Sequence, residues 1–212
     1  MTSASSFWVL ATQNAKKAKE LVALSQGAVT VKTLKDLGLD DLEIIEDGAT
    51  FSANAEIKSR TIWAHLKAEG VKTLPEWIIA DDSGICVAAL NDRPGIRSAR
   101  YALDAGCGEG DEDNNALLFK ELSENKAAED RKAFFACAVC AVNEQGEQKN
   151  FYGEVHGTIA HDLKGEGGFG YDPLFIPNAY PQQRMAELTA VEKHAISHRG
   201  HAMRALCAAL IP

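Results

Sequence analysis

An α/β fold is predicted by strand–turn–helix patterning in the first half of the sequence and long paired strands in the second half. Residues 7–11 form a short apolar run that leads through a polar turn into a segment with helical spacing of apolar residues. The acidic segment 106–113 is expected to be a flexible loop before a helix at about 114–124. Residues 131–142 and 151–160 are expected to be two strands joined by a polar hairpin loop. The sequence therefore predicts an α/β half joined to an antiparallel or mixed sheet.

The composition is that of a globular protein with one domain of good size or two small ones. Of the 212 residues, 46% are hydrophobic and 25% are charged, which is enough to bury a substantial core. The 30 acidic and 22 basic residues give a net charge of −8, which argues against non-specific binding to nucleic acid or to an anionic membrane. A small phosphorylated ligand is compatible with this charge, because a local cluster of Lys and Arg is enough to bind it.

Neither a membrane span nor a secretion signal is expected. The sequence contains no run of about 18 apolar residues, and residues 1–6 lack the charged start and apolar middle of a signal peptide. The five cysteines are an odd number and are scattered, which indicates reduced thiols in a cytoplasmic protein. Cys137 and Cys140 form a C-x-x-C inside a strand-like run, and we interpret them as packing thiols.

The central stretch, residues 77–84, is the first candidate for a ligand site. Its first four residues are apolar and predict a buried strand, which is expected to end at Asp81 and Asp82, followed by Ser83 and Gly84. Ligands of α/β folds bind at the carboxyl ends of strands, and an acidic pair beside a glycine suits a divalent metal and a phosphate. Because successive strand residues point to opposite faces, the two aspartates are not expected to share one role. The alternative is a strand end followed by an Asx or Ser turn.

Two further segments carry candidate binding residues. The turn after the first strand contains Thr12 and Asn14, with Lys17 in the first helical turn, and a helix N-terminus of this kind can bind an anion. An ordinary N-cap with surface lysines is the alternative. Thr50 can cap a helix at 51–68.

On that second helix, Asn54 and Lys58 are four residues apart and share one face, which could simply be a solvated face. Glu46, just before the helix, could be a metal ligand or merely part of an acidic loop.

The glycine-rich segment 165–170 matches G-x-G-x-x-G, but its context excludes a dinucleotide-binding fingerprint. That fingerprint follows a strand and opens a helix, whereas here Pro173 and an apolar run predict a strand. A glycine loop that carries Phe169 and Tyr171 could instead allow its backbone and an aromatic ring to close over a flat base. A wide connecting turn is the alternative.

The C-terminal region combines a helix start with a histidine cluster. Thr189 and Glu192 form a capping-box pattern that opens a short helix with Lys193. Three histidines between residues 194 and 201 have helical spacing, but no carboxylate completes a zinc site and Arg199 would repel the cation. We therefore do not interpret them as zinc ligands.

Five motifs occur in the order found in one family. They are Thr12-x-Asn14-x-x-Lys17, Ala80-Asp81-Asp82-Ser83-Gly84, Pro94-Gly95-Ile96-x-Ser98-Ala99-Arg100-Tyr101, Gly167-Gly168-Phe169-Gly170-Tyr171-Asp172-Pro173 and Ala195-Ile196-Ser197-His198-Arg199-Gly200. On these motifs the chain closely resembles the inosine triphosphate pyrophosphatases, also called XTP/dITP diphosphatases. The resemblance implies a single α/β domain over residues 1–212, elongated, with a mixed central sheet flanked by helices and an active-site cleft between two lobes. It also implies a homodimer.

The resemblance further implies Mg²⁺-dependent hydrolysis of ITP, dITP and XTP to the monophosphate and pyrophosphate, which removes these nucleotides from the pool. Glu46 and Asp82 would serve the metal, Asp82 or Asp81 would be the base, and Lys58 would offset phosphate charge at the catalytic centre. The residues that would bind substrate are Thr12, Asn14, Lys17, Asn54, Ser83, Phe169, Gly170, Tyr171, Asp172, Lys193, His198 and Arg199.

One position departs from the family pattern, and two other functions stay open. The family has Gly between the Thr and the Asn of the first motif, where this chain has Gln13. A related pyrophosphatase with another base preference is one alternative, and a substrate panel would distinguish it. A non-catalytic nucleotide-binding regulator is the other, although such a protein has no need of Glu46, Asp82 and Lys17 together. His198 and Arg199 are the residues expected to read the keto group of the base.

Overall fold

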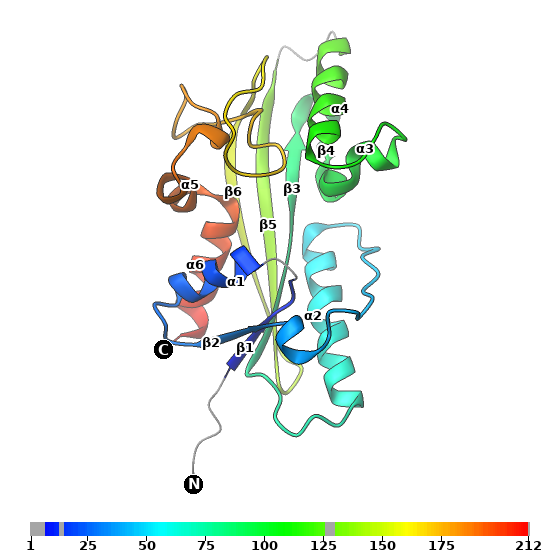
Figure 1. The fold of residues 1–212 in the computed structure, drawn as a ribbon, viewed down its shortest axis with the longest axis vertical. Coiled ribbons are helices and arrows are strands. Elements are labelled where there is room, and N and C mark those ends of the chain that lie inside the picture. The colour runs from blue at the N-terminus through cyan, green and yellow to red at the C-terminus, as the bar shows by residue number, and fades with distance from the viewer. Residues whose placement is uncertain (1–6, 13–14, 126–129, 212) are drawn as a thin grey trace. The chain divides into compact units, whose positions relative to one another are not determined.

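The computed structural model describes residues 7–12, 15–125 and 130–211, apart from the side chains of residues 15–17 and 20. Its helices and strands are β1 (Phe7–Leu10), α1 (Ala15–Leu24), β2 (Thr30–Thr33), α2 (Phe51–Ala68), β3 (Trp77–Val87), β4 (Arg93–Pro94), α3 (Tyr101–Asp104), α4 (Asp111–Glu124), β5 (Lys132–Asn143), β6 (Gln148–Ile159), β7 (Phe175–Pro177), α5 (Ala190–Ile196) and α6 (His198–Leu210) (Figure 1). The chain divides into two compact units. The first unit contains residues 1–82, 138–152 and 202–212, and the second contains residues 83–137 and 153–201.

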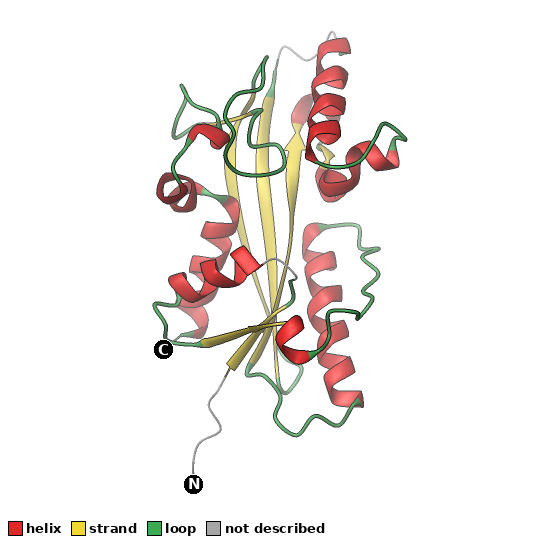
Figure 2. Cartoon of the chain, in the orientation of Figure 1, coloured by secondary structure: helices red, strands yellow, loops and turns green. Residues whose placement is uncertain are grey.

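The strands of the described residues form one mixed sheet, with helices beside it (Figure 2). The strand order is β2–β1–β3–β5–β6–β7, and β4 pairs with β3. β1 runs parallel to β2 and β3, whereas β4 and β7 each run antiparallel to their partners. The predicted α/β class with a mixed central sheet flanked by helices is therefore confirmed. No helix of the described residues is long and apolar enough to cross a membrane.

β3 differs from the prediction where the acidic pair lies. The sequence predicts that this strand ends at Asp81, but β3 continues through the pair without interruption to Val87. The expected strand end and the alternative Asx or Ser turn are both wrong, because Asp82 and Ser83 find side-chain partners while the backbone stays extended.

β1, in contrast to β3, ends close to where the sequence predicts, just before the turn that is a candidate ligand site. The N–H of Ala11 donates to the carbonyl oxygen of Ile79 at 2.7 Å, which continues the parallel pairing of β1 with β3. Thr12 therefore leaves the sheet beside the acidic part of β3. This is the carboxyl end of a parallel strand, where α/β folds bind their ligands.

In the first unit, α2 packs its apolar stripe on the sheet. Ile62 and Leu66 of α2 are buried in one cluster with Val9 of β1 and Ile78 of β3. Thr50 caps the helix as predicted, because its Oγ1 accepts the N–H of Ala53 at 3.1 Å. The buried stripe and the cap hold the first turns of α2 in a fixed position, and these turns carry the site residues.

In the second unit, α4 begins earlier than the sequence predicts. Its first turn contains Asp111, Glu112 and Asp113, which were expected to be part of a flexible loop. Three carboxylates at a helix N-terminus interact favourably with the helix dipole, so the acidic segment stabilises a helix start. Leu118 of α4 is buried in the same core as Phe135 of β5.

Candidate functional site

Asp82 of β3 is bound by two side chains of α2. Nδ2 of Asn54 donates to Oδ2 of Asp82 at 3.0 Å, and Nζ of Lys58 lies 3.6 Å from Oδ1 of the same carboxylate. Asn54 is only 2% exposed and Lys58 is mostly buried, so their shared helix face is not a solvated one. The predicted common face of these two residues therefore exists, and it points at a carboxylate that keeps some access to solvent.

Glu46 reaches the same lysine from the loop before α2. Its Oε2 lies 2.7 Å from Nζ of Lys58, so one ammonium group contacts two carboxylates. The backbone N–H of Gly48 donates to Oδ1 of Asn54 at 2.8 Å, which fastens this loop to the helix. A Cβ at position 48 would lie 2.6 Å from that oxygen, so the close approach requires glycine.

The two aspartates of β3 differ in environment, as the alternation of strand residues predicts. Asp81 is 4% exposed, whereas the Asp82 side chain is 16% exposed and contacts Lys58. This contrast favours Asp82 as the group that can meet a ligand. Of the first motif, Thr12 is half-buried at the end of β1, Asn14 lies outside the described residues, and Lys17 belongs to α1 but its side chain is not described.

In the second unit, Asp172 and Lys193 organise the glycine loop. Oδ2 of Asp172 accepts the N–H of Phe169 at 2.8 Å and forms an ion pair with Lys193, whose Nζ lies 4.5 Å from the centre of the Phe169 ring. Burial raises the pKa of Asp172, and the charge and hydrogen bond of Lys193 oppose that rise. Phe169 is 56% exposed, although Asp172, which accepts its N–H, is buried.

Half-buried Ser83 and the buried His198 and Arg199 form a second group of this unit. Nη2 of Arg199 donates to Oγ of Ser83 at 3.0 Å, and its guanidinium lies 5.8 Å from the Phe169 ring. The His198 ring stacks on Phe135 with a centroid distance of 5.0 Å and an interplanar angle of 10°. These contacts fix the direction of two side chains that can donate hydrogen bonds.

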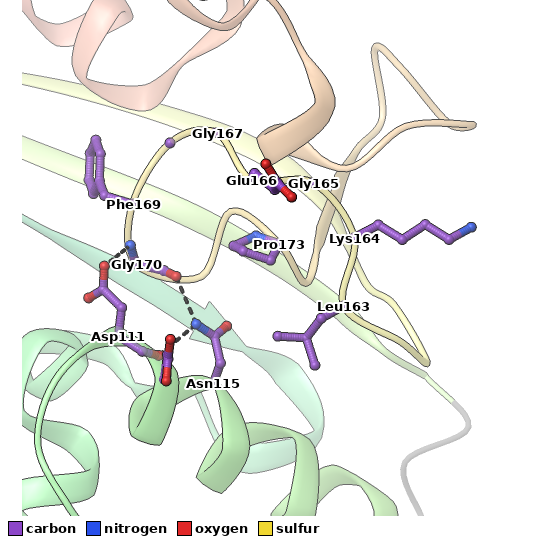
Figure 3. Close-up of a pocket in the computed structure, with 12 residues that line it drawn as sticks. Asp111, Asn115, Leu163, Lys164, Gly165, Glu166, Gly167, Phe169, Gly170 and Pro173 are labelled. Carbon is purple, nitrogen blue, oxygen red and sulfur yellow. Dashed lines mark hydrogen bonds between the residues drawn. The ribbon is translucent and has the colours of Figure 1, made fainter.

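Tyr171 and Gly170 attach the loop to two different parts of the second unit. The Tyr171 side chain is buried and donates from its hydroxyl to the carbonyl oxygen of Ser98 at 2.8 Å, so it anchors the loop to the core. The N–H of Gly170 donates to Asp111 of α4 at 2.6 Å (Figure 3). The loop leads into β7 and opens no helix, which confirms that it is not a dinucleotide-binding fingerprint.

Comparisons with known proteins place the chain in a family. The sequence model of the Ham1 family matches residues 8–209. The chain belongs to the Ham1 family. It is 40% identical to a dITP/XTP pyrophosphatase of Clostridium perfringens over 94% of both chains, and 41% identical to one of Geobacter sulfurreducens over 93% of both. These relatives confirm the resemblance on which the sequence analysis relied.

Solved structures agree with this assignment to the Ham1 family. A HAM1 protein from Coxiella burnetii superposes with a TM-score of 0.83 at 35% identity, covering 97% of this chain and 98% of the other. The Ham1 protein of Staphylococcus aureus gives a TM-score of 0.80 at 38% identity, covering 96% and 97%. The fold is thus shared over nearly the whole length.

The donor set of this Ham1 family chain fits a divalent metal ion at Glu46 and Asp82. Both carboxylates contact Lys58, so they lie close to one another, and the three side chains together carry a net charge of −1. Mg²⁺ prefers carboxylate oxygens and takes only one or two from protein, leaving the other positions to phosphate and water. Glu46 and Asp82 are therefore the residues that would hold the ion.

Two residues that contact the glycine loop were missed by the sequence analysis. Asp111 and Asn115 of α4 hydrogen-bond to Gly170, 59 and 55 positions away in the chain. Their segment was interpreted as an acidic loop and the start of a helix, and nothing in its spacing points to a partner so distant. An acidic first helical turn was the only signal that could have drawn attention to Asp111.

Proposed function

We propose that this chain hydrolyses non-standard purine nucleoside triphosphates, namely dITP, XTP and ITP, to the monophosphate and pyrophosphate in the presence of Mg²⁺. The observation that carries the proposal is the Asp82 carboxylate held by Asn54 and Lys58, with Glu46 on the same lysine. Relatives named dITP/XTP pyrophosphatases, about 40% identical over nearly the full chain, support the choice of substrate class.

In this reaction, water attacks the α-phosphorus and forms a new P–O bond there, while the bond from the α-phosphorus to the oxygen that bridges to the β-phosphate breaks. Asp82 accepts the proton of the attacking water, and pyrophosphate leaves with the bridging oxygen. Bound Mg²⁺ would neutralise phosphate charge and lower the pKa of water. Lys58, which already contacts Asp82 and Glu46, places a positive charge at the same point, because phosphoryl chemistry needs positioning and charge neutralisation more than covalent work.

The residues around Phe169 would bind the nucleoside. The exposed ring offers a stacking surface for a purine, and Lys193 and Arg199 border it. A 6-keto purine presents an acceptor where adenine presents an amino donor, so the donors of His198 and Arg199 suit a 6-keto base and disfavour adenine. A site built around such hydrogen bonds can reject the mismatched base by about 10⁴-fold, because its buried donors would be left unpaired. Guanine has the same 6-keto group, so the low turnover expected for dGTP rests on the substrates in the names of the relatives.

The remaining assignments are part of the same proposal. Ser83 and Asp172 position Arg199 and Lys193 at the nucleoside, Gly170 and Tyr171 shape the loop, and Thr12, Asn14 and Lys17 hold the triphosphate. We also propose that residues 1–212 act as a single domain, as a homodimer, and in the cytoplasm. All five cysteines are free thiols, which supports a reducing compartment.

Pyrophosphate release from dITP, XTP and ITP, beside dATP and dGTP, tests the proposal. With Mg²⁺ we expect fast turnover of the three keto substrates that are not standard nucleotides and little turnover of the other two, and chelation of the metal should stop the reaction. Comparable rates across the panel would indicate a pyrophosphatase of another base preference. Metal-dependent nucleotide binding without pyrophosphate release would indicate a regulator.

A further inference from the structure

A pocket lies between α4 and the glycine loop that carries Phe169. A cavity of about 390 Å³ lies between the first turn of α4, with Asp111, Glu112 and Asn115, and the loop at residues 163–170 with Pro173 (Figure 3). The Phe169 ring projects from the loop on the side away from Asp111. Because the loop does not pack solidly against α4, its position relative to this helix depends on the few bonds that cross to the helix.

The bonds from α4 hold both the N–H and the carbonyl oxygen of Gly170. Oδ2 of Asp111 accepts the N–H of Gly170 at 2.6 Å, and Nδ2 of Asn115 donates to the carbonyl oxygen of Gly170 at 2.8 Å. Gly170 has a φ of +60°, in the left-handed region that favours glycine. The helix thus fixes both hydrogen-bonding groups of a residue whose backbone would otherwise have wide freedom.

The Asn115 amide has only one orientation that satisfies these bonds. Its Nδ2 donates to two carbonyl oxygens, of Gly170 at 2.8 Å and of Asp111 at 2.7 Å, so the amide cannot be turned over. Its side chain is buried at 3% exposure, and Oδ1 has no partner among the described residues. A buried amide that leaves its own oxygen unpaired in order to hold the loop is a costly arrangement, and such arrangements commonly mark a functional role.

Two carboxylates from different elements therefore hold consecutive N–H groups. Asp172, two residues after Gly170, accepts the N–H of Phe169 at 2.8 Å, and Asp111, on α4, accepts the N–H of Gly170 at 2.6 Å. Phe169 lies between these two bonds. A shift of either acceptor would move the backbone that carries the exposed ring.

We propose that Asp111 and Asn115 are positioning residues for Phe169: they set the place of the aromatic ring against the purine through the Gly170 backbone. The inference rests on the proposed function, in which Phe169 stacks on the base. Neither residue touches the substrate. Their effect is on binding and on base choice, and the chemical step at Asp82 is left unchanged.

Asp111→Ala tests the proposal, with Glu112→Ala as its matched control. Glu112 is exposed in the same helical turn and carries the same charge, so the control reproduces the change at the helix N-terminus. Losing one charge-assisted hydrogen bond should raise KM for dITP by about tenfold with kcat nearly unchanged. Asp111→Asn keeps an acceptor oxygen, so its KM for dITP should be close to that of the wild type. Equal effects of Asp111→Ala and Glu112→Ala would overturn the proposal.

A double-mutant cycle with Phe169→Ala shows whether Asp111 acts through the ring. Phe169→Ala should raise KM at least as much as Asp111→Ala, and the double variant should be no worse than Phe169→Ala alone. Additive effects would mean that Asp111 acts elsewhere and would contradict the proposal.

Hydrogen exchange of the loop separates this inference from the proposed function, because it needs no nucleotide. Backbone N–H groups at 169–170 should exchange faster in Asp111→Ala than in Glu112→Ala. If the wild type hydrolysed none of the nucleotides, the proposed function would fail, whereas unchanged exchange in an active enzyme would refute the positioning role alone.

Discussion

The backbone N–H of Gly48 donates to Oδ1 of Asn54 at 2.8 Å. The other end of the same amide donates to Asp82 at 3.0 Å. One buried side chain of α2 therefore ties the loop that carries Glu46 to the carboxylate of β3. The orientation of this amide is set by its two partners, and any change that rotates it separates them.

Gly48→Ala should disturb this link by steric overlap. A Cβ at position 48 would lie 2.6 Å from Oδ1 and 2.9 Å from the backbone N of Asn54, too close for either to remain in place. We expect kcat/KM to fall about tenfold or more and the free energy of unfolding to fall by about 1–3 kcal/mol. Steady-state kinetics and urea unfolding measure the two effects.

Gly70→Ala is the control for the Gly48 variant. Gly70 has a φ of +64° and open space around its missing Cβ. The substitution should cost about 1 kcal/mol of stability through backbone strain and leave kcat/KM unchanged. If Gly48→Ala behaved in the same way as Gly70→Ala, the link through Asn54 would not matter to the site.

Asp82→Asn should abolish turnover while the protein stays folded. The amide is similar in size to the carboxylate but cannot accept the proton of the attacking water, and a positioned base contributes about 10²–10⁴-fold in rate. Pyrophosphate release gives the activity, and circular dichroism with a urea midpoint shows whether folding is intact. Near-normal turnover in a folded Asp82→Asn variant would transfer the role of base to another residue.

Glu46→Gln should weaken the dependence on Mg²⁺ selectively. Replacing this carboxylate removes one of the two oxygen ligands expected for the ion, so the Mg²⁺ concentration for half-maximal rate should rise by about tenfold or more. Asp47→Asn is the matched control, because Asp47 is exposed in the next position of the same loop. A similar shift in both variants would mean that Glu46 acts through its negative charge alone and is not a ligand of the ion.

Local signals were enough to predict the elements that position the site. Thr50 and the apolar spacing of α2 predict a helix at 51–68, and the structure has the same limits. The predicted strand end at Asp81 is wrong because polarity was taken to break the strand. The partners that stabilise Asp82 and Ser83 lie on α2 and at the start of α6, and strand periodicity carries no information about them.

The site shows the same division between local and distant contacts. Helical spacing alone places Asn54 and Lys58 on one face, but whether that face is solvated depends on its packing against β3. The contact of Asp111 with Gly170 joins residues that are 59 positions apart in the chain. Only the folded chain brings these groups together, so residue pattern could not predict the bond.

The capping box of α5 gives a pH dependence of known sign. Both Oγ1 and the backbone N–H of Thr189 donate to Oε2 of Glu192, at 2.6 and 2.9 Å, and these bonds lower the pKa of Glu192 below 4.5. A depressed pKa in the folded state adds stability above pH 4.5 that is lost as the pH falls through the folded-state pKa.

Glu192→Gln should therefore be less stable than wild type at neutral pH, with a difference that shrinks as the pH falls. Urea unfolding at intervals from about pH 6 to about pH 3 measures it. Glu43→Gln, a change at an exposed loop residue, should show no such trend. A difference independent of pH would mean that the carboxylate charge of Glu192 does not contribute.

Thiol reactivity should single out Cys107. This residue is exposed, whereas the other four cysteines are buried. Burial raises the pKa of Cys86 to about 12 and also raises the pKa of Cys140 and Cys207, so these thiols are protonated as well as inaccessible. A disulfide reagent at mildly alkaline pH should label the native protein rapidly at Cys107, and Cys107→Ser should remove the fast phase. All five thiols should react in urea. A fast phase that survives in Cys107→Ser would show that one of the buried thiols is reached by local opening of the native fold.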